Sequence, residues 1–412
     1  MKRLTVLLLF CASLSFAQSP SFPSWQEGYF DIHHISTGSG NATFFVFPDG
    51  TTLLFDAGDV DRKSRLKVPN PLKASPPLPN DAVSAAACIA GYINHVYPSR
   101  MIDYAVISHF HTDHFGSINS QSKLSSKGNY RLSGITEVNE YIPIKKIIDR
   151  NYPFYNYPVD VKTYSFDKES FRNYIDFINS QSDKKLLSVE ALQAGSKNQI
   201  RLLNKPARYP SFSVRNIKSN GEVWSGDGEK VIRIIPDSLA QKDYNENPLS
   251  IALKITYGKF DYFTGGDMTG LQGFGLPGWF DTETPVAKVV GPTDALSLNH
   301  HGVRDASNEF FLKSLAPRVI VQQSWSSNHP GEEVLHRLIS PALPGKRDIF
   351  ATYIHEETIT TYGRWLEENY LSKHGHIVIR VEPTGNIFYV YILDDITPEP
   401  KILKTFGPYE SH

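Results

Sequence analysis

Hydrophobic and polar positions alternate between residues 28 and 58 as they do in short β-strands. Residues 29–35 alternate, and after a Gly-rich polar turn two further apolar runs follow at 43–47 and 51–55, separated by a Pro-Asp-Gly turn. A period of two with turn residues at the breaks predicts β-strands joined by tight turns. We therefore expect a pair of β-hairpins here. His33 and His34 fall in the first strand, where only one of them can face a core, and both are expected to be structural.

From residue 82 onward, helical periods alternate with short apolar runs. Helices are expected at 82–97, 307–315 and 331–340, and strands at 102–107, 231–235, 249–257, 261–264, 295–298, 318–322, 349–353, 377–381 and 387–393. Helices that alternate with strands are typical of α/β proteins. A chain of 412 residues can form one large domain or two or three smaller ones. We expect a single domain over residues 18–412.

The stretch from about 120 to 230 is less regular and is interpreted as an insertion in that domain. Helical periodicity is visible within it at 168–179 and at 183–194. Residues 151–158 hold four aromatic residues and two prolines. Such a loop can pack on the surface, form the wall of a pocket, or build an aromatic cage for a quaternary ammonium group. The sequence leaves these alternatives open.

Residues 108–116 read Ser-His-Phe-His-Thr-Asp-His-Phe-Gly and directly follow an apolar run. Three imidazoles and one carboxylate at the end of a predicted strand indicate a metal site. His109 and His111 alternate and can face one ion, whereas Asp113 and His114 are adjacent and must point elsewhere, toward a second ion. Imidazole with carboxylate favours two divalent ions, Zn²⁺ first, with Mn²⁺ or Fe as alternatives.

Other candidate site residues also stand at the ends of predicted strands. Asp56 is expected to orient a ligand histidine, and Asp267, in a Gly-rich turn, is the candidate bridging ligand. One of His300 and His301 should complete the second metal site while its neighbour touches substrate, because adjacent side chains on an extended backbone point in opposite directions. His329 is a candidate general acid or phosphate contact, with an ordinary loop histidine as the alternative.

Composition excludes few functions, but the first residues predict export. The chain is 40% hydrophobic and 21% charged with a net charge of −1, which argues against a generic polyanion binder.

Residues 1–17 have the pattern of a signal peptide: Lys2 and Arg3, an apolar run, and small residues before the expected cleavage after Ala17. We therefore expect a periplasmic or secreted protein without a transmembrane segment after cleavage. Cys88 would then be the only cysteine.

The order of the motifs resembles that of the metallo-β-lactamase superfamily. Ser-His-x-His-x-Asp-His-x-Gly at 108–116 is followed by Thr-Gly-Gly-Asp at 264–267 and Asn-His-His-Gly at 299–302. The chain is most similar to the branch that holds the extracytoplasmic domain of the competence protein ComEC and the phosphorylcholine esterases of Gram-positive bacteria. Further matches lie at 37–41 with 56–58, at 247–250, at 310–312 and at 328–330.

This resemblance covers about residues 28–120 and 230–395, and leaves the insertion uncovered. Ser36 and Asn41 stand where ComEC-like sequences usually carry Asp, so no role is transferred to those positions. The fold implied is an αββα sandwich of the α/β class, with two mixed sheets face to face, helices outside and metals at one edge.

The ligand set implied for the first ion is His109 and His111. Asp113, His114 and either His300 or His301 would hold the second ion, and Asp267 would bridge the two. Two adjacent divalent ions acidify a water between them and clamp an anionic transition state, while Asp113 can also orient the nucleophile by a hydrogen bond.

The function expected first is that of a metal-dependent hydrolase, a phosphodiesterase that acts on a small-molecule or lipid-like anionic substrate. A lactonase or β-lactamase is an alternative, although no histidine lies between His114 and His300 to supply the further imidazole of those enzymes. An extracellular nuclease is a second alternative, so nucleic acid remains a possible but not favoured partner. A non-catalytic metal-binding protein is a third, against which the complete ligand set argues.

Overall fold

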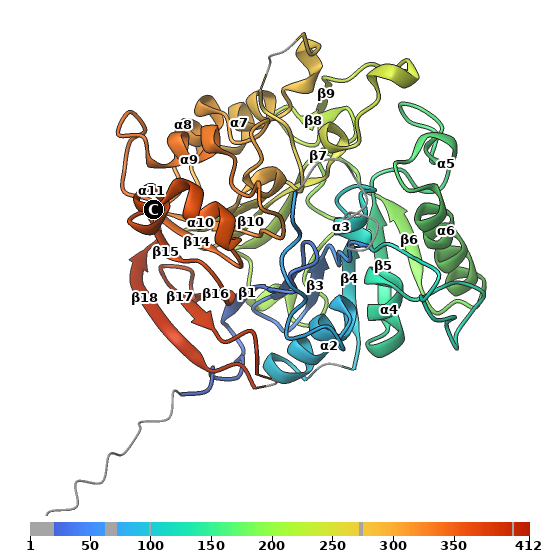
Figure 1. Cartoon of the computed structure of the whole chain (residues 1–412), viewed down its shortest axis with the longest axis horizontal. Helices are drawn as coiled ribbons and strands as arrows, with labels where there is room; N and C mark the ends of the chain where they lie inside the picture. Colours follow the sequence, from blue (N-terminus) through green and yellow to red (C-terminus); the bar gives the residue numbers. More distant parts are fainter. Residues whose placement is uncertain (1–19, 62–71, 99, 272–274, 398) are drawn as a thin grey trace, which may run out of the picture.

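Two nine-stranded sheets pack face to face in the computed structural model, with helices on both outer sides (Figure 1). The structure describes residues 20–61, 72–98, 100–271, 275–397 and 399–412. The predicted signal peptide, residues 1–17, lies outside the described residues. The layer order helix, sheet, sheet, helix is the αββα sandwich that the motifs led us to expect, and it confirms the predicted fold class.

The first sheet contains the predicted N-terminal strands and the C-terminal strands of the chain. Its order is β18–β17–β16–β1–β2–β3–β4–β5–β6, with neighbours antiparallel from β18 to β3 and parallel from β3 to β6. The strands are β1 (Phe30–His34), β2 (Thr43–Val46), β3 (Thr52–Phe55), β4 (Ile102–Val106), β5 (Ile144–Asp149), β6 (Ser188–Ala191), β16 (His376–Val381), β17 (Ile387–Leu393) and β18 (Ile402–Glu410).

The second sheet has the order β15–β14–β13–β12–β11–β10–β7–β8–β9. Neighbours are parallel from β15 to β11 and antiparallel from β11 to β9. The strands are β7 (Phe212–Ser219), β8 (Glu222–Trp224), β9 (Val231–Arg233), β10 (Ala252–Tyr257), β11 (Phe260–Thr264), β12 (Ala295–Ser297), β13 (Val319–Gln322), β14 (Asp348–Ala351) and β15 (Tyr370–Ser372).

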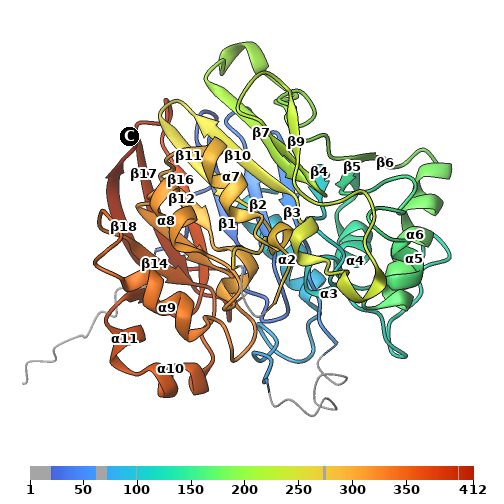
Figure 2. The same cartoon turned by 90° about the horizontal axis from the view of Figure 1, so that it is seen from above.

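Helices cover the outer face of each sheet. On the first sheet they include α2 (Ala85–Val96), α3 (Thr112–Phe115), α4 (Gly134–Tyr141), α5 (Val161–Tyr164) and α6 (Lys168–Asp183); on the second, α7 (Glu283–Val290), α8 (Glu309–Leu315), α9 (Glu332–Ile339), α10 (Glu356–Tyr362) and α11 (Arg364–Glu367). Figures 1 and 2 both place α5 and α6 at one end of the molecule, beside β6, and α10 and α11 at the other, near β14.

Alternation along the strands divides the apolar side chains among three cores. In β2, Phe45 joins the core between the sheets, whereas Phe44 joins the core under α2, α4 and α6. In β11, Tyr262 faces the other sheet, and its neighbour Phe263 packs under α7, α8 and α9. Because both faces of each sheet are covered, the strands read as nearly continuous apolar runs.

Both histidines of β1 are buried, so the prediction that only one of them can face a core is wrong. His33 Nδ1 lies 3.0 Å from the hydroxyl of Tyr92 in α2, and His34 Nε2 lies 2.8 Å from the hydroxyl of Tyr262 in β11. A strand inside a four-layer sandwich has a core on each side, which accommodates both rings. Their structural role is as expected.

Residues 120–230 continue both sheets and are not an addition outside the sandwich. They supply β5 and β6 to the first sheet, and β7 and β8 to the second. The helix expected at 168–179 is present as α6, but the helix expected at 183–194 is wrong. Residues 188–191 form β6 instead, with Val189 paired to Ile147. Pairing with β5 overrides the local helical period, because strand formation depends on partners distant in sequence.

The buried ion pair between Asp31 in β1 and Arg380 in β16 gives a stability prediction. Arg380 donates from Nε to Oδ1 (2.8 Å) and from Nη2 to Oδ2 (2.6 Å). We expect Asp31→Asn to lower the free energy of unfolding by about 3–5 kcal/mol, because it leaves a buried guanidinium without its charge partner. Urea unfolding followed by circular dichroism measures the change.

The exposed pair Lys230–Asp227 provides the control for this measurement. Asp227→Asn should change stability very little, because solvent screens exposed pairs. If Asp31→Asn costs no more than Asp227→Asn, the buried pair does not hold β1 to β16 as we describe.

Candidate metal centre

The segment after β4 carries four of the predicted metal ligands: His109 and His111 lie in the loop before α3, and Asp113 and His114 lie in α3. Asp56 fixes the conformation of this segment. Asp56 lies just after β3 with a positive φ of 63°. Its Oδ1 accepts the N–H of Ser108 (2.7 Å), and its Oδ2 accepts the Ser108 hydroxyl (2.8 Å) and lies 2.8 Å from Nδ1 of His114. Asp56 therefore orients a ligand histidine, as the sequence predicts.

Two glycines explain why Gly-rich motifs accompany the ligand loop. A Cβ at Gly58 would lie 1.8 Å from the carbonyl oxygen of Asp113, and a Cβ at Gly40 would lie 2.4 Å from it. The N–H of Asn41 donates to the same oxygen at 2.8 Å. Only residues without a side chain allow the backbone to approach this closely, so both turns hold Asp113 in place.

The structure brings the predicted ligands together in two sets that share Asp267. One set contains His109, His111 and Asp267; the other contains Asp113, His114, Asp267 and His301; within each set the donor atoms lie within 4.8 Å of one another. Asp267 Oδ1 is 3.2 Å from His114 Nε2, and its Oδ2 is 3.7 Å from His109 Nε2. The grouping separates the pair His109 and His111 from the pair Asp113 and His114, as the spacing leads us to expect. That these groups bind metal stays a prediction.

The orientation of the imidazoles fits metal binding. Nδ1 of His109 is held by the Ser108 hydroxyl (3.1 Å), Nδ1 of His114 by Asp56, and Nδ1 of His301 by the carbonyl of Gln323 (3.0 Å). Each ring therefore turns Nε2 toward the centre. Nε2 of His109, Nε2 of His114 and Oδ1 of Asp267 are buried without a hydrogen-bond partner. Buried polar atoms are rarely left in this state, and divalent cations would satisfy them.

His301, and not His300, joins the second set. The backbone at both residues is left-handed, with φ of 46° at His300 and 52° at His301, and not extended as the sequence interpretation assumed. His301 Nε2 lies 2.9 Å from Asp113 Oδ2. His300 instead places Nδ1 at 2.6 Å from Asp305 Oδ1 and Nε2 at 3.0 Å from the Asn247 amide. It lines the pocket beside the centre without belonging to either ligand set.

His329 lies against the centre on the far side of His301. The two rings stack with centroids 4.7 Å apart, and His329 Nδ1 accepts the backbone N–H of Trp325 at 3.3 Å. Burial and the neighbouring His301 hold the pKa of His329 well below its usual value. The ring is therefore neutral near pH 7 with its proton on Nε2, which makes it a hydrogen-bond donor. Its role as a general acid or a phosphate contact stays a prediction.

Sequence reasoning missed two buried glutamates that brace the ligand loops. Glu246 Oε1 accepts the N–H of Phe110, which stands between His109 and His111, at 2.9 Å. Arg150 donates to both carboxylate oxygens of Glu246, at 2.6 and 2.7 Å. A carboxylate in a loop carries no periodicity that would have revealed this role.

Glu283, at the start of α7, braces the loop of His300 and His301. Its carboxylate accepts the Asn299 amide (2.7 Å) and the N–H groups of Ser307 (2.6 Å) and Asn308 (2.7 Å). Burial raises the pKa of Glu283 to about 7. Each ligand loop thus depends on one buried glutamate that itself binds no metal.

A pocket of about 260 Å³ opens beside the two ligand sets. Its described lining includes, besides the donor residues, Leu72, Phe166, Val303, Trp325, Asn328 and His329. None of residues 151–158 lines it. Tyr155 is buried with its hydroxyl on Asp149 (2.7 Å), and the Tyr157 hydroxyl donates to the carbonyl of Ile235 (3.1 Å). The aromatic loop packs on the body of the protein, so the interpretation as an aromatic cage at this site is wrong.

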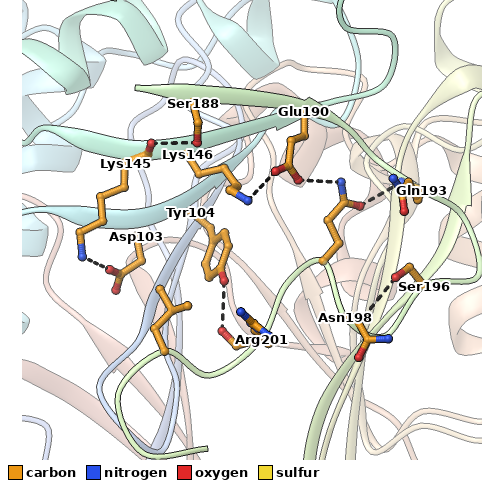
Figure 3. A pocket seen from close by; sticks show the side chains of 12 residues that line it. Asp103, Tyr104, Lys145, Lys146, Ser188, Glu190, Gln193, Ser196, Asn198 and Arg201 are labelled. Atoms are coloured by element: carbon orange, nitrogen blue, oxygen red, sulfur yellow. Dashed lines mark hydrogen bonds and ion pairs between the residues drawn. The ribbon is translucent and has the colours of Figure 1, made fainter. Parts of the chain in front are cut away.

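A second hollow, of about 500 Å³, lies near the starts of β4, β5 and β6 (Figure 3). Four of its five charged side chains pair with one another: Lys145 with Asp103 and Lys146 with Glu190, each at 2.6 Å. Its described lining holds no histidine. The metal-ligating chemistry is therefore at the other end of β4.

Comparison with known proteins finds only distant similarity. No family model and no curated protein matches the chain. Among solved structures it is similar to a mutant of the CmlA beta-hydroxylase (12% identity, TM-score 0.37, 88% of this chain and 55% of that chain), to Zn²⁺-bound PqqB from Methylobacterium extorquens (12%, 0.30, 66% and 72%) and to unliganded yeast PDE1 (11%, 0.35, 85% and 98%). The chain thus spans about half the length of the CmlA protein.

The architecture is the αββα sandwich that the resemblance of the motifs to the metallo-β-lactamase superfamily implies. Two facing mixed sheets are covered by helices, and the ligands of both sets come from loops at the ends of β4, β11 and β12. This arrangement and the order of the motifs carry the conclusion.

The two braces predict separable effects on metal binding. Glu246→Gln replaces the carboxylate that binds Arg150 with an amide, which loosens the backbone between His109 and His111. Affinity for the ion of the set that contains these two histidines should therefore fall by about 10- to 100-fold. Calorimetric and absorption titrations of the metal-free protein with Co²⁺ would resolve the two binding events.

Glu283→Gln is the matched control, because it replaces the brace of the other loop. It should lower the affinity for the ion of the set formed by Asp113, His114 and His301. The affinity for the ion of the other set should stay unchanged. Thermal unfolding measured alongside shows that both variants are folded. If both variants weaken the same Co²⁺-binding event to the same extent, the two glutamates do not support separate ligand sets.

Protons should compete with metal at this centre. Burial alone lowers the pKa of His114, but the carboxylates of Asp267, Asp113 and Asp56 outweigh it and raise that pKa well above its usual value. Asp267 and Asp113 likewise raise the pKa of His301 to about 9. A cation binds the deprotonated ring, so affinity should increase as the pH rises toward about 9, with roughly two protons released near pH 7. Calorimetry in buffers of different ionisation enthalpy counts these protons, and pH-independent affinity would contradict the assignment.

Proposed function

We propose that the chain is a metal-dependent hydrolase with two divalent cations, most simply Zn²⁺, and that it cleaves phosphodiesters. The observation that carries this proposal is the carboxylate of Asp267, which belongs to both ligand sets and would hold two cations side by side. Paired cations, when bound, supply a water that is nucleophilic at neutral pH and charge to stabilise an anionic transition state.

The residues around the ligands have distinct tasks in this proposal. Trp325 donates from Nε1 to Asp113 Oδ2 (3.0 Å), which fixes that carboxylate where it can orient a water. His329 can donate from Nε2 to an oxygen of the substrate. Leu72, Phe166 and Val303 form an apolar margin that excludes bulk water and so strengthens these polar contacts.

Pocket size and the ligand set favour a small phosphodiester. A pocket of about 260 Å³ holds a small group beside the ligands, and a substrate centred on one anionic phosphorus matches a centre of two cations. The first set has only two imidazoles and Asp267, with none of the further histidine expected in lactonases and β-lactamases. A carbonyl hydrolase is therefore the less favoured reading.

A nuclease is the second candidate, and one sequence feature favours it. Arg62, Lys63, Arg65 and Lys67 stand a few residues before Leu72, which lines the pocket; these four lie outside the described residues. Binding of a nucleic acid by such a run would weaken steeply as salt increases, whereas turnover of a small diester would not.

We also propose that the protein is exported, on the pattern of residues 1–17. Among the described residues, no helix has the length and hydrophobicity needed to cross a bilayer. Fractionation of cells that produce the full chain, with mass determination of the mature N-terminus, tests cleavage after Ala17.

Hydrolysis of a chromogenic panel by the Zn²⁺-loaded mature protein tests the activity. We expect chelator-sensitive cleavage of bis-p-nitrophenyl phosphate, and a fall in kcat of at least about 100-fold in Asp267→Asn, because both ligand sets lose their shared carboxylate. The panel includes p-nitrophenyl phosphorylcholine, a cephalosporin, a lactone and single-stranded DNA at low and high salt.

Asp227→Asn, an exposed substitution, serves as the control and should retain full activity. Turnover of only the cephalosporin or the lactone would overturn the phosphodiesterase assignment. Cleavage of DNA alone, lost at high salt, would replace it with the nuclease.

A further inference from the structure

A separate hollow of about 360 Å³ adjoins the metal pocket. Among the residues that the structure describes, Leu271, Leu276, Val303, Arg304 and Asp305 line it. Val303 lines both spaces, so the hollow begins where the metal pocket ends. Asp305 also connects them, because its carboxylate lies 2.6 Å from Nδ1 of His300 in the metal pocket.

The floor of this hollow is apolar, and its charged groups already have partners. Leu271, Leu276 and Val303 present only hydrocarbon. The Asp305 carboxylate is engaged by His300, and the Arg304 guanidinium lies 3.6 Å from Glu333. The side chains of Leu271, Leu276 and Val303 offer a polar group no hydrogen-bond partner, whereas a hydrocarbon chain that packs against them leaves water and gains stability.

Exposed apolar side chains also line the metal pocket and the adjoining hollow. Phe166 is 87% exposed, Leu276 41% and Leu72 37%. Single exposed hydrophobic residues are common on protein surfaces, but these three border one opening and its adjoining hollow. The Phe166 ring lies 6.0 Å from the ring of the ligand His111. The apolar surface therefore extends from the candidate ligands to the hollow.

We propose that the hollow of Leu271, Leu276 and Val303 is a subsite for an aliphatic arm of the substrate. This inference rests on the proposed function and narrows it: the substrate is a phosphodiester with one ester group at the ligand sets and an alkyl or acyl chain that passes over Val303. The chain-bearing arm explains why apolar side chains remain exposed along the metal pocket and the hollow, since an amphiphilic substrate covers them when it binds.

A homologous series of p-nitrophenyl alkyl phosphates tests the subsite, with methyl, butyl, hexyl and octyl arms at concentrations below micelle formation. Burial of each methylene should raise kcat/KM by about two- to fourfold until the hollow is filled. Leu276→Ser and Leu271→Ser should flatten this dependence on chain length. Leu186→Ser, at an exposed leucine that lines neither space, is the matched control and should keep it.

Binding of methyl- to octylphosphonate to the Zn²⁺-loaded protein, measured by calorimetry, separates this inference from the proposed function. Cleavage of the methyl ester without any gain from longer arms would overturn the subsite and leave the phosphodiesterase standing. A different result would overturn the phosphodiesterase and leave the subsite standing. In that result no ester is cleaved, but phosphonate affinity rises with chain length in wild type and does not rise in Leu276→Ser. Equal affinity for all phosphonates would overturn the subsite in every case.

Discussion

The buried carboxylate of Asp267 is the feature on which the rest of the site depends. It is 1% exposed, its Oδ1 has no hydrogen-bond partner, and four imidazoles, those of His109, His114, His300 and His301, lie within 4 Å of its oxygens. A charge buried in this way is costly unless cations surround it. Cationic rings hold the pKa of Asp267 well below its usual value despite burial, and divalent ions would do the same more strongly.

The sandwich holds this arrangement by joining the ligand loops across the two sheets. His109 to His114 follow β4 of the first sheet, whereas Asp267 and His301 follow β11 and β12 of the second. The N–H of Ile251 donates to the carbonyl of Ser108 at 2.9 Å, which ties the loop before β10 to the ligand loop. Glu246 comes from that same region and pairs with Arg150, which follows β5. The apolar core between the sheets therefore sets the distance between the ligand residues that follow β4 and those that follow β11 and β12.

Much of the site could be predicted because metal ligation demands few residue types at short spacing. The pairs His109/His111 and Asp113/His114 are local, and their assignment to different ligand sets follows from spacing alone. The choice between His300 and His301 did not follow, since it depends on left-handed backbone at both residues. Glu246, Glu283 and Trp325 gave no local signal, because their partners lie far away along the chain.

The sequence by itself determined the α/β class, the strands with strong alternation, and the residues able to ligate metal. These properties depend on neighbours within a few positions. Tertiary structure alone decided that residues 188–191 form a strand, that both His33 and His34 are buried, and that the aromatic loop at 151–158 stays away from the metal pocket. Each of these outcomes depends on which distant segment covers a given face, and pairing between distant segments leaves no periodic trace in the chain.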